Sequence, residues 1–415
     1  MSVETITLGC RLNFAESEAM KALLATDRER VIVNSCAVTA EAVRQTRQAI
    51  RRARRERPLA EIIVTGCAAQ LEPERFAVMP EVDLVLGNGA KLNPSPFVSS
   101  EVETRLRERP STSLGTSGKV FAPDFPAAIA VAAGFMSRVR SFVAIQTGCD
   151  HRCTFCTIWQ ARGPSHSLPF AAIRDAVARE IDRGAKEIVL TGVDITSVER
   201  GLGRLCQRLL AAEPRLKRLR LSSLDGVEID DALFDLIAGE PRLLPHFHLS
   251  LQSGDDLILK RMKRRHSRAD AVRTVARIKA ARPDATIGAD LIAGFPTETE
   301  VMAANSLELL DECDVVAAHI FPFSPRPNTP AARMPQVDPA TIKRRAARLR
   351  DAAATRRSGW LERQIGSLQR VLIENNLKGH SDSFAPVTVS GSVRGETMSV
   401  RIAARDGDQL IGTRA

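Results

Sequence analysis

Short apolar runs alternate with helical segments along most of this chain, and this alternation limits the possible folds more than any other feature. In the first part of the chain the runs lie at residues 4–8, 30–33, 61–65 and 82–86. Helices are predicted between them at residues 15–25 and 40–55. Because parallel strands need a long crossover connection, strand–helix–strand units of this kind favour parallel sheets. The sequence therefore predicts an α/β protein.

A second series of strands and helices begins near Ser141. Its six candidate strands lie at residues 142–146, 187–191, 218–222, 247–251, 286–292 and 315–321. Helices are predicted at residues 171–183, 230–238, 268–281 and 299–313. Asp230 is a candidate N-cap for the second of them. Six strand–helix units predict a partial (βα)6 barrel, in which functional groups gather at the carboxyl ends of the strands.

The predicted elements divide the chain into four parts. Residues 1–92 form an N-terminal α/β domain, and residues 93–134, which are rich in Pro, Ser and Thr, form a linker. Residues 135–364 form the barrel domain, which ends in a basic helix at 341–363. The last part, residues 365–415, changes to short strands at 369–373, 386–390, 398–402 and 409–411. This pattern predicts a small β-barrel.

Three cysteines follow the first strand of the predicted barrel. Cys149, Cys153 and Cys156, here called the loop trio, lie within eight residues of one another. A compact loop of this kind can bind three irons of a 4Fe-4S cube and leave the fourth iron open for a small molecule. Zinc is the alternative, with His151 or His166 as a fourth ligand. The spacing favours the iron–sulfur cluster.

Three further cysteines each follow one of the N-terminal strands. They are Cys10, Cys36 and Cys67, here called the N-terminal trio. The carboxyl ends of parallel strands share one edge of a sheet, so these thiols can converge in one crevice and hold a second metal cluster. Taken singly, each is also an ordinary candidate for a buried core cysteine. Core packing explains the remaining two, Cys206 and Cys313.

The basic residues are numerous and clustered. The formal net charge is +10, and the most basic stretch is 44–57, with shorter runs at 260–268 and 343–350. This distribution suits a polyanion such as nucleic acid, with a solvated helix face as the alternative. No apolar run approaches the roughly 20 residues of a membrane span, and the start of the sequence has no signal-peptide pattern. We therefore expect no membrane partner and a cytoplasmic location.

Segments along nearly the whole chain resemble the tRNA methylthiotransferases, in particular the branch that acts on N6-threonylcarbamoyladenosine. Besides the loop trio, they lie at residues 7–13, 33–39, 64–70, 190–195, 248–254, 288–298 and 321–327. The resemblance implies an N-terminal methylthiotransferase domain, a partial radical S-adenosylmethionine (SAM) barrel and a C-terminal β-barrel of the TRAM type that binds tRNA. The chain departs from many relatives at Trp159-Gln160 and at His166.

The resemblance also implies cofactors, partners and a reaction. Two 4Fe-4S clusters are expected, one on the loop trio that binds SAM and an auxiliary one on the N-terminal trio. An electron from a reducing partner would cleave SAM to a radical, and a second SAM would supply the methyl group for methylthiolation at carbon 2 of the adenine. The implied substrate is a tRNA anticodon stem-loop that carries threonylcarbamoyladenosine. No catalytic residue beyond the cluster ligands is expected.

Polar residues at the ends of the barrel strands are candidates for contacts with SAM. They are Thr191, Asp194, Ser223, Gln252 and Asp290. The ring of Phe155 is a candidate for packing on the adenine of SAM. Each polar residue could equally serve as a helix cap or turn residue, and Phe155 as an ordinary buried ring.

Two other functions remain open at this stage. The same chemistry could act on isopentenyladenosine in tRNA or on an aspartate of a ribosomal protein, as in sister branches of the family. A non-catalytic tRNA-binding protein with structural zinc belongs to another class. Iron content and reductive cleavage of SAM distinguish that protein from the enzyme.

Overall fold

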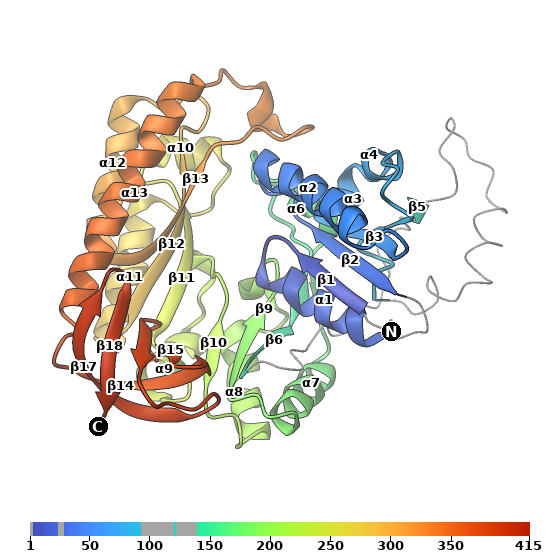
Figure 1. The fold of residues 1–415 in the computed structure, drawn as a ribbon. Helices are drawn as coiled ribbons and strands as arrows, with labels where there is room; N and C mark the ends of the chain where they lie inside the picture. The colour runs from blue at the N-terminus through green and yellow to red at the C-terminus, as the bar shows by residue number, and fades with distance from the viewer. Residues whose placement is uncertain (1–2, 24–28, 93–119, 122–138) are drawn as a thin grey trace.

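The computed structural model of the protein describes residues 3–23, 29–92, 120–121 and 139–415. Its strands form an N-terminal parallel sheet, an open series of parallel strands and a closed C-terminal barrel (Figure 1). These units follow one another along the chain, from blue through green and yellow to red. The predicted class, α/β with a small terminal β-barrel, is confirmed.

The N-terminal sheet has five strands in the order β1-β2-β3-β4-β5. They are β1 (Val3–Thr7), β2 (Arg30–Ser35), β3 (Glu61–Gly66), β4 (Leu84–Leu86) and β5 (Val120–Phe121). The helices are α1 (Arg11–Leu23), α2 (Ala40–Glu56), α3 (Cys67–Leu71) and α4 (Pro73–Ala77). Val43, Ile50 and Ala53 lie on one face of α2 and pack with the buried valines of β2 and β3.

Two features of this sheet differ from the sequence prediction. β5 adds an edge strand from within residues 93–134, which the sequence predicts as a linker; residues 93–119 and 122–134 lie outside the described part of the chain. Helix α1 begins at Arg11, four residues before its predicted start. The first turn was missed because it contains Asn13, a polar residue that is buried here and donates hydrogen bonds to the carbonyls of Leu8 and Ser35.

The barrel strands form two parallel sheets, ordered β10-β9-β6 and β11-β12-β13. They are β6 (Arg140–Ala144), β9 (Glu187–Thr191), β10 (Leu219–Leu221), β11 (His246–Gln252), β12 (Thr286–Ala293) and β13 (Val315–Pro322). Isolated bridges, Leu219 to Leu243 and Leu224 to Leu249, join the two sheets where β10 is short. The result is the predicted open arc of six strands. A two-stranded ribbon of β7 (Gln146–Thr147) and β8 (His166–Ser167) follows β6.

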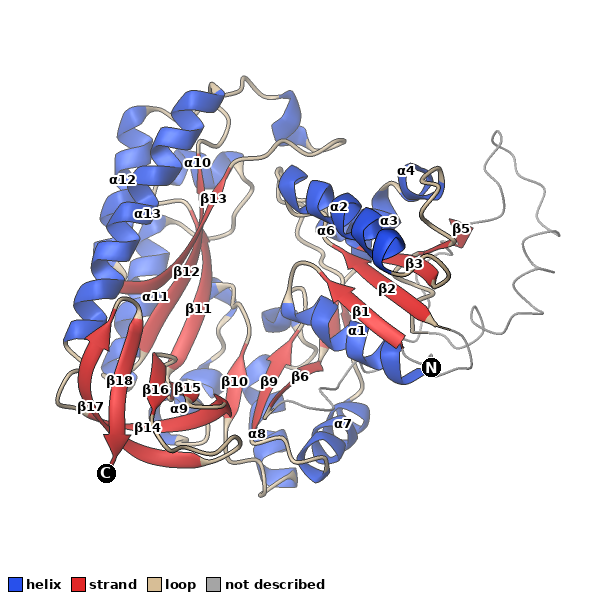
Figure 2. Cartoon of the chain, in the orientation of Figure 1, coloured by secondary structure: helices blue, strands red, loops and turns tan. Residues whose placement is uncertain are grey.

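Helices cover the outer side of the arc (Figure 2). The longer ones are α7 (Phe170–Asp182), α8 (Leu202–Ala212), α9 (Asp231–Gly239), α11 (Arg268–Ala281), α12 (Glu300–Glu312) and α13 (Pro339–Glu362). The short ones are α6 (Ile158–Arg162), α10 (Asp256–Arg261) and the 3-10 turns η2 (Ile195–Ser197), η3 (Gly226–Glu228) and η4 (Pro330–Arg333). Asp230 caps α9 as predicted, because its side chain accepts from the backbone N–H of Leu233. No helix in the described ranges is long and apolar enough to cross a membrane.

The C-terminal barrel closes in the order β14-β15-β16-β18-β17. Its strands are β14 (Leu368–Asn375), β15 (Lys378–Ser381), β16 (Pro386–Val389), β17 (Thr397–Asp406) and β18 (Gln409–Arg414). The sequence prediction has four of these and lacks β15. That strand carries no apolar alternation, and at Gly379 a side chain would meet the Leu372 carbonyl at 2.0 Å. Close backbone packing therefore positions β15, and its side chains show no pattern from which the strand could be predicted.

A buried cluster of arginines attaches this barrel to the parallel strands. The Glu187 carboxylate, which is fully buried, accepts from Arg140, Arg218 and Arg220. Each of these arginines also reaches the C-terminal barrel, where the acceptors are the side chains of Glu374 and Asp382 and the carbonyls of Ser381 and Asp382. One carboxylate thus organises three cations at the interface between the two units.

Candidate metal centres

The structure brings the N-terminal trio to one edge of the parallel sheet. Cys36 and Cys67 directly follow β2 and β3, whose last residues Ser35 and Gly66 are paired in the ladder. Cys10 follows β1, the next strand of the sheet. Burial, together with the nearby thiolates of Cys67 and Cys10, raises the pKa of Cys36 to about 12. Cys10 has an exposed surface, but desolvation of its thiol still raises its pKa, with a contribution from the Cys67 thiolate. The three sulfurs therefore share one crevice.

A glycine permits this approach. Gly9 has a φ of +95°, and a Cβ at this position would lie 2.9 Å from both Cβ and Sγ of Cys36. Glycine alone adopts this backbone conformation without strain and leaves the space empty. Gly9 thereby allows the Cys10 segment to lie directly against Cys36.

The loop trio lies on the segment between β7 and α6. Burial raises the pKa of Cys149 to about 12 and that of Cys156 to about 11, and the neighbouring thiolates of the trio raise both. Gly148 makes the turn into the loop with a φ of +72°, where a Cβ would lie 1.8 Å from the Pro164 carbonyl oxygen. The loop is thus folded back against the segment that follows α6.

The two trios face each other across the two units. Among the charges that raise the pKa of Cys156 is the thiolate of Cys67, which belongs to the other trio. Helix α6, which directly follows the loop trio, packs against α3, which begins at Cys67. Two metal centres at these positions would be neighbours.

The spacing of the sulfurs suits a cluster better than a single ion. In the described ranges, neither trio is among the groups whose three ligand atoms all lie within 4.8 Å of one another. A tetrahedral zinc ion with bonds of about 2.3 Å needs thiolates about 3.8 Å apart. A 4Fe-4S cube attaches each thiolate to a different iron and accommodates a wider spacing. The spacing of the three sulfurs in each trio therefore suits the cluster, whereas Cys149, His151 and Asp194 lie close enough together for a single metal ion.

Arg162 connects the two units beside the N-terminal trio. Its Nε donates to the Cys67 sulfur at 3.3 Å, and its terminal nitrogens donate to Glu16 at 2.5 and 2.9 Å and to Asn13 at 2.6 Å. Arg162 lies on α6 of the barrel unit, whereas Glu16 and Asn13 lie on α1. All of these side chains are buried. A cation from one unit is thus held against a thiol of the other.

Glu16 carries two buried cations. Lys91 donates to it at 2.5 Å and also to Asn88 at 2.7 Å, while Asn88 donates to the Ala161 carbonyl at 2.7 Å. Burial raises the pKa of Glu16, but the charges of Arg162 and Lys91 outweigh burial and lower it to about 2. The two cations exceed the single carboxylate by one positive charge beside the Cys67 sulfur.

The loop trio also has an arginine beside one of its sulfurs. Arg264 donates to the Cys153 sulfur at 3.7 Å and to Asp225 at 2.7 Å. His151, within the loop, lies 3.4 Å from both Asp194 and Glu228, and burial lowers its pKa. The loop is therefore fixed by charged groups from the carboxyl ends of neighbouring strands.

The six residues predicted to contact SAM lie in different surroundings. Asp194 lies beside Cys149 and His151, and Phe155 packs edge-on against Phe295 with ring centroids 6.5 Å apart. Asp290 belongs to a different cluster, in which His248 at 2.8 Å and His319 at 3.1 Å contact its carboxylate. Thr191 is buried at the end of β9. Ser223 is exposed after β10, and Gln252 ends β11 with a φ of +68°.

Trp159, where the chain departs from many relatives, has a partner in the loop. The Arg152 guanidinium stacks over its ring at 4.3 Å and donates to the Cys149 carbonyl at 3.0 Å. The aromatic face thus supports the loop trio through a cation–π contact.

Sequence reasoning missed the charged residues around both trios. Arg162 and Arg264 reach their cysteines across 95 and 111 positions of sequence. Lys91 and Glu16 are 75 positions apart. In the sequence these charged residues stand next to apolar segments. Many exposed charged residues do so as well, and the pattern therefore does not mark them as buried.

Two protein families match the chain. Residues 143–310 match the radical SAM superfamily, and residues 2–87 match an uncharacterised protein family, UPF0004. The threonylcarbamoyladenosine tRNA methylthiotransferase MtaB of Rickettsia prowazekii is 43% identical over 392 residues, which cover 92% of this chain and 90% of that protein. The MtaB protein of Thermotoga maritima is 33% identical over 433 residues, which cover 100% of this chain and 97% of that protein.

The chain belongs to this family of methylthiotransferases. The resemblance inferred from the sequence is thereby confirmed, and the protein is a radical SAM enzyme, which implies a 4Fe-4S cluster and SAM. A tRNA-2-methylthio-N(6)-dimethylallyladenosine synthase of Erythrobacter litoralis is also similar, with 31% identity over 98% of this chain and 95% of that protein.

Solved structures share the fold. The radical SAM methyltransferase TsrM of Kitasatospora setae matches with a TM-score of 0.53 and 16% identity over 76% of this chain and 66% of that one. The cobalamin-dependent SAM radical enzyme OxsB matches with a TM-score of 0.50 and 11% identity over 85% of this chain and 56% of that one. At this level of identity the likeness concerns the fold alone.

Proposed function

We propose that this protein inserts a methylthio group at carbon 2 of N6-threonylcarbamoyladenosine, next to the anticodon of tRNA, in the cytoplasm. The observation that carries the proposal is the pair of facing cysteine trios, because sulfur insertion requires a second metal centre beside the one that binds SAM. Relatives named as threonylcarbamoyladenosine tRNA methylthiotransferases match nearly the full chain, which supports this substrate.

In this proposal each unit has one task. Residues 1–92 hold the auxiliary 4Fe-4S cluster on Cys10, Cys36 and Cys67, and residues 135–364 hold the SAM-binding cluster on the loop trio. Residues 365–415 are a TRAM-like domain that binds the anticodon stem-loop, and residues 93–134 link the first two domains. When bound, the clusters and SAM supply the electron-transfer, radical and methyl-transfer chemistry, with an electron from a reducing protein partner.

The protein's own side chains bind and orient these groups. Arg162 directs a buried N–H at the Cys67 sulfur, and Arg264 directs one at the Cys153 sulfur. Hydrogen bonds to ligand sulfurs stabilise their negative charge and fix their orientation. Asp194 lies beside Cys149, where its carboxylate can accept a hydrogen bond from the amino or hydroxyl groups of SAM. Phe155 and Phe295 give the same region an apolar wall.

The test is an anaerobic reaction of the reconstituted enzyme with reductant, SAM and tRNA that carries threonylcarbamoyladenosine. We expect the 2-methylthio derivative of that nucleoside in mass spectra of the digested tRNA. Parallel reactions with isopentenyladenosine tRNA and with ribosomal proteins define the branch. A product on one of those substrates alone would refute the proposal.

A variant with all three residues of the N-terminal trio changed to alanine provides the control. It should keep about four irons per chain and cleave SAM reductively, but form no methylthio product. The wild type should bind about eight irons per chain. Stoichiometric zinc without SAM cleavage in the wild type would instead indicate a structural metal protein.

A further inference from the structure

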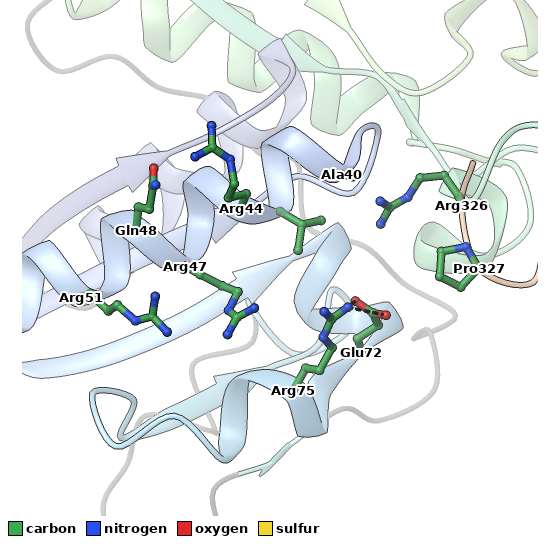
Figure 3. A pocket seen from close by; sticks show the side chains of 10 residues that line it. Ala40, Arg44, Arg47, Gln48, Arg51, Glu72, Arg75, Arg326 and Pro327 are labelled. Atoms are coloured by element: carbon green, nitrogen blue, oxygen red, sulfur yellow. Dashed lines mark hydrogen bonds and ion pairs between the residues drawn. The ribbon is translucent and has the colours of Figure 1, made fainter. Parts of the chain in front are cut away.

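A pocket of about 270 Å³ opens between helix α2 and the segment that follows β13 (Figure 3). Five arginines line it. Arg44, Arg47 and Arg51 lie on α2, Arg75 lies on α4, and Arg326 lies on the segment after β13. In Figure 3 the α2 arginines lie on one side and Arg326 points toward them from the other. The pocket thus lies between the N-terminal and barrel units, and it belongs to neither cysteine trio.

The positive charge in this pocket exceeds the negative charge. Glu72 is the carboxylate in the lining, and Arg75 pairs with it at 2.8 Å. Arg44 pairs with Glu41 at 2.7 Å on the exposed side of α2, and Arg51 lies 3.8 Å from Glu81. The structure gives no carboxylate within salt-bridge distance of Arg47 or Arg326 in the described ranges.

Two buried N–H groups of the pocket lack an acceptor. Arg326 is 8% exposed, and its Nε has no hydrogen-bond partner within the described ranges. The Nε of Arg47 is in the same state. A buried cationic N–H without an acceptor is costly, because it has lost its water without gaining a partner. An anion in the pocket would supply both the acceptor and the missing charge.

The pocket adjoins the N-terminal trio. Burial lowers the pKa of the Arg326 guanidinium, whereas the Glu72 carboxylate and, to a smaller extent, the Cys36 thiolate raise it, so Cys36 lies near this arginine. Ala40, the first residue of α2, lines the pocket, and its N–H donates to the Ser324 hydroxyl at 3.2 Å. An anion bound here would lie beside the centre from which sulfur is delivered.

We propose that this pocket binds backbone phosphates of the tRNA strand next to the adenosine that reaches the N-terminal trio. The inference rests on the proposed function. Arg44, Arg47 and Arg51 recur at spacings of three and four on α2 and span roughly 10 Å of helix, which is more than one small anion can contact. Guanidinium groups bind phosphate oxygens in a bidentate manner and carry no base specificity. The pocket therefore positions the strand, whatever its sequence.

Binding of RNA to the reconstituted holoenzyme tests the proposal. Two hairpins with the same anticodon stem-loop sequence are compared, one unmodified and one carrying threonylcarbamoyladenosine, over a range of salt concentrations. Arg326→Gln and Arg47→Gln are the test variants, since the first is buried and the second is partly exposed. Arg52→Gln is the matched control, because Arg52 lies on α2, has a 73% exposed side chain and does not line the pocket.

We expect each test variant to bind both hairpins roughly tenfold more weakly. The slope of log affinity against log salt should fall in magnitude by about 0.7 for each phosphate contact removed. In Arg52→Gln both the affinity and the salt slope should stay close to the wild-type values, because only one distant charge is lost. Unaltered melting temperature and iron content in the test variants exclude a general folding defect.

Three results would overturn the inference. Wild-type affinity and salt slope in both test variants would show that the pocket does not hold the strand. A loss confined to the threonylcarbamoylated hairpin would show that the arginines bind the carboxylate of the modification instead of the phosphates. A wild type that binds neither hairpin would refute the proposed function as well, so the two failures are distinguishable.

Discussion

At the scale of single residues, Arg162 places a buried positive charge beside the N-terminal trio. It is fully enclosed between Glu16, Asn13 and the Cys67 sulfur. A reduced cluster carries more negative charge than an oxidised one, and a cation next to a ligand sulfur stabilises the reduced form. The reduction potential of the proposed auxiliary cluster should therefore depend on this arginine.

We predict that Arg162→Gln lowers that potential. A loss of about 1.4 kcal/mol of preferential stabilisation corresponds to about 59 mV for one electron, so the expected shift is on the order of 60 mV. The measurement is a redox titration followed by electron paramagnetic resonance. The titration uses a protein in which the three cysteines of the loop trio are changed to alanine, so that only the auxiliary cluster contributes to the signal. Arg162→Lys, which keeps the charge, should shift the potential less.

Arg152→Gln serves as the comparison for this experiment. Arg152 lies on the loop that precedes α6, stacks on Trp159 and contacts no sulfur of the N-terminal trio in the described structure. An equal shift in Arg152→Gln and Arg162→Gln would mean that general charge, and not the contact at Cys67, sets the potential.

Gly9 provides a second prediction at this scale. In Gly9→Ala the new methyl group would lie 2.9 Å from Cβ and Sγ of Cys36, so the two cysteines must separate. We expect loss of about four of about eight irons per chain, measured by iron analysis, with SAM cleavage retained. Gly184→Ala is the matched control, because Gly184 has a similar φ of +97° but nothing within 4 Å of the added Cβ. Equal iron loss in both variants would indicate backbone strain instead of the clash.

At the scale of elements, the regular pattern of apolar runs predicted most strands, and the exceptions have physical causes. β15 was missed because it is held by backbone contacts at Gly379, and β5 because two residues carry no periodicity. The start of α1 was missed because Asn13 is buried by hydrogen bonds to the backbone. Hydrophobic periodicity reveals elements that bury apolar faces, but not elements placed by polar contacts.

Glu187, at the start of β9, is the element-scale test. Burial raises its pKa, but the charges of Arg220, Arg140 and Arg218 outweigh burial and lower it to about 2. A lowered pKa means that this stability is present above the ordinary pKa near 4.5 and is lost as the pH falls toward 2. We predict that Glu187→Gln lowers the free energy of unfolding at pH 7 by about 3 kcal/mol, measured by urea denaturation. The difference from wild type should shrink as the pH falls from 4.5 toward 2.

Limited proteolysis should show where the stability is lost. Because the three arginines hold the C-terminal barrel through Glu374 and Asp382, the Glu187→Gln variant should be cleaved faster near residue 365. Glu199→Gln, at a pair in which both side chains are about four-fifths exposed, should stay within about 0.5 kcal/mol of wild type. A constant difference across the acid range would exclude Glu187 as the titrating group.

At the scale of the whole molecule, the two trios face each other across the interface between the units. Cys67 is near enough to Cys156 to raise its pKa. Two reduced clusters at such positions should interact magnetically. We predict broadened electron paramagnetic resonance signals in the fully reduced wild type, compared with the sum of the spectra of the two triple-alanine variants. A wild-type spectrum equal to that sum would place the clusters farther apart.

The sequence revealed the six cysteines of the candidate site but not its surroundings. A thiol directly after a strand is visible in the sequence, because strand ends of one parallel sheet meet at a common edge. Arg162 and Arg264 are different, since their partners come from another unit or a distant strand. Their pairing depends on how the units dock, and no local pattern encodes it. Arg326 was missed for the same reason.

The contact between Arg162 and Cys67 also has a consequence for the growing polypeptide. Arg162 is synthesised 95 residues after Cys67. At a translation rate of roughly 5 to 20 residues per second, Cys67 waits on the order of 5 to 20 s for the guanidinium that covers it. During that interval the N-terminal sheet can form while its crevice stays open toward the side that α6 later closes. The cluster proposed for the N-terminal trio could therefore be inserted before Arg162 covers Cys67.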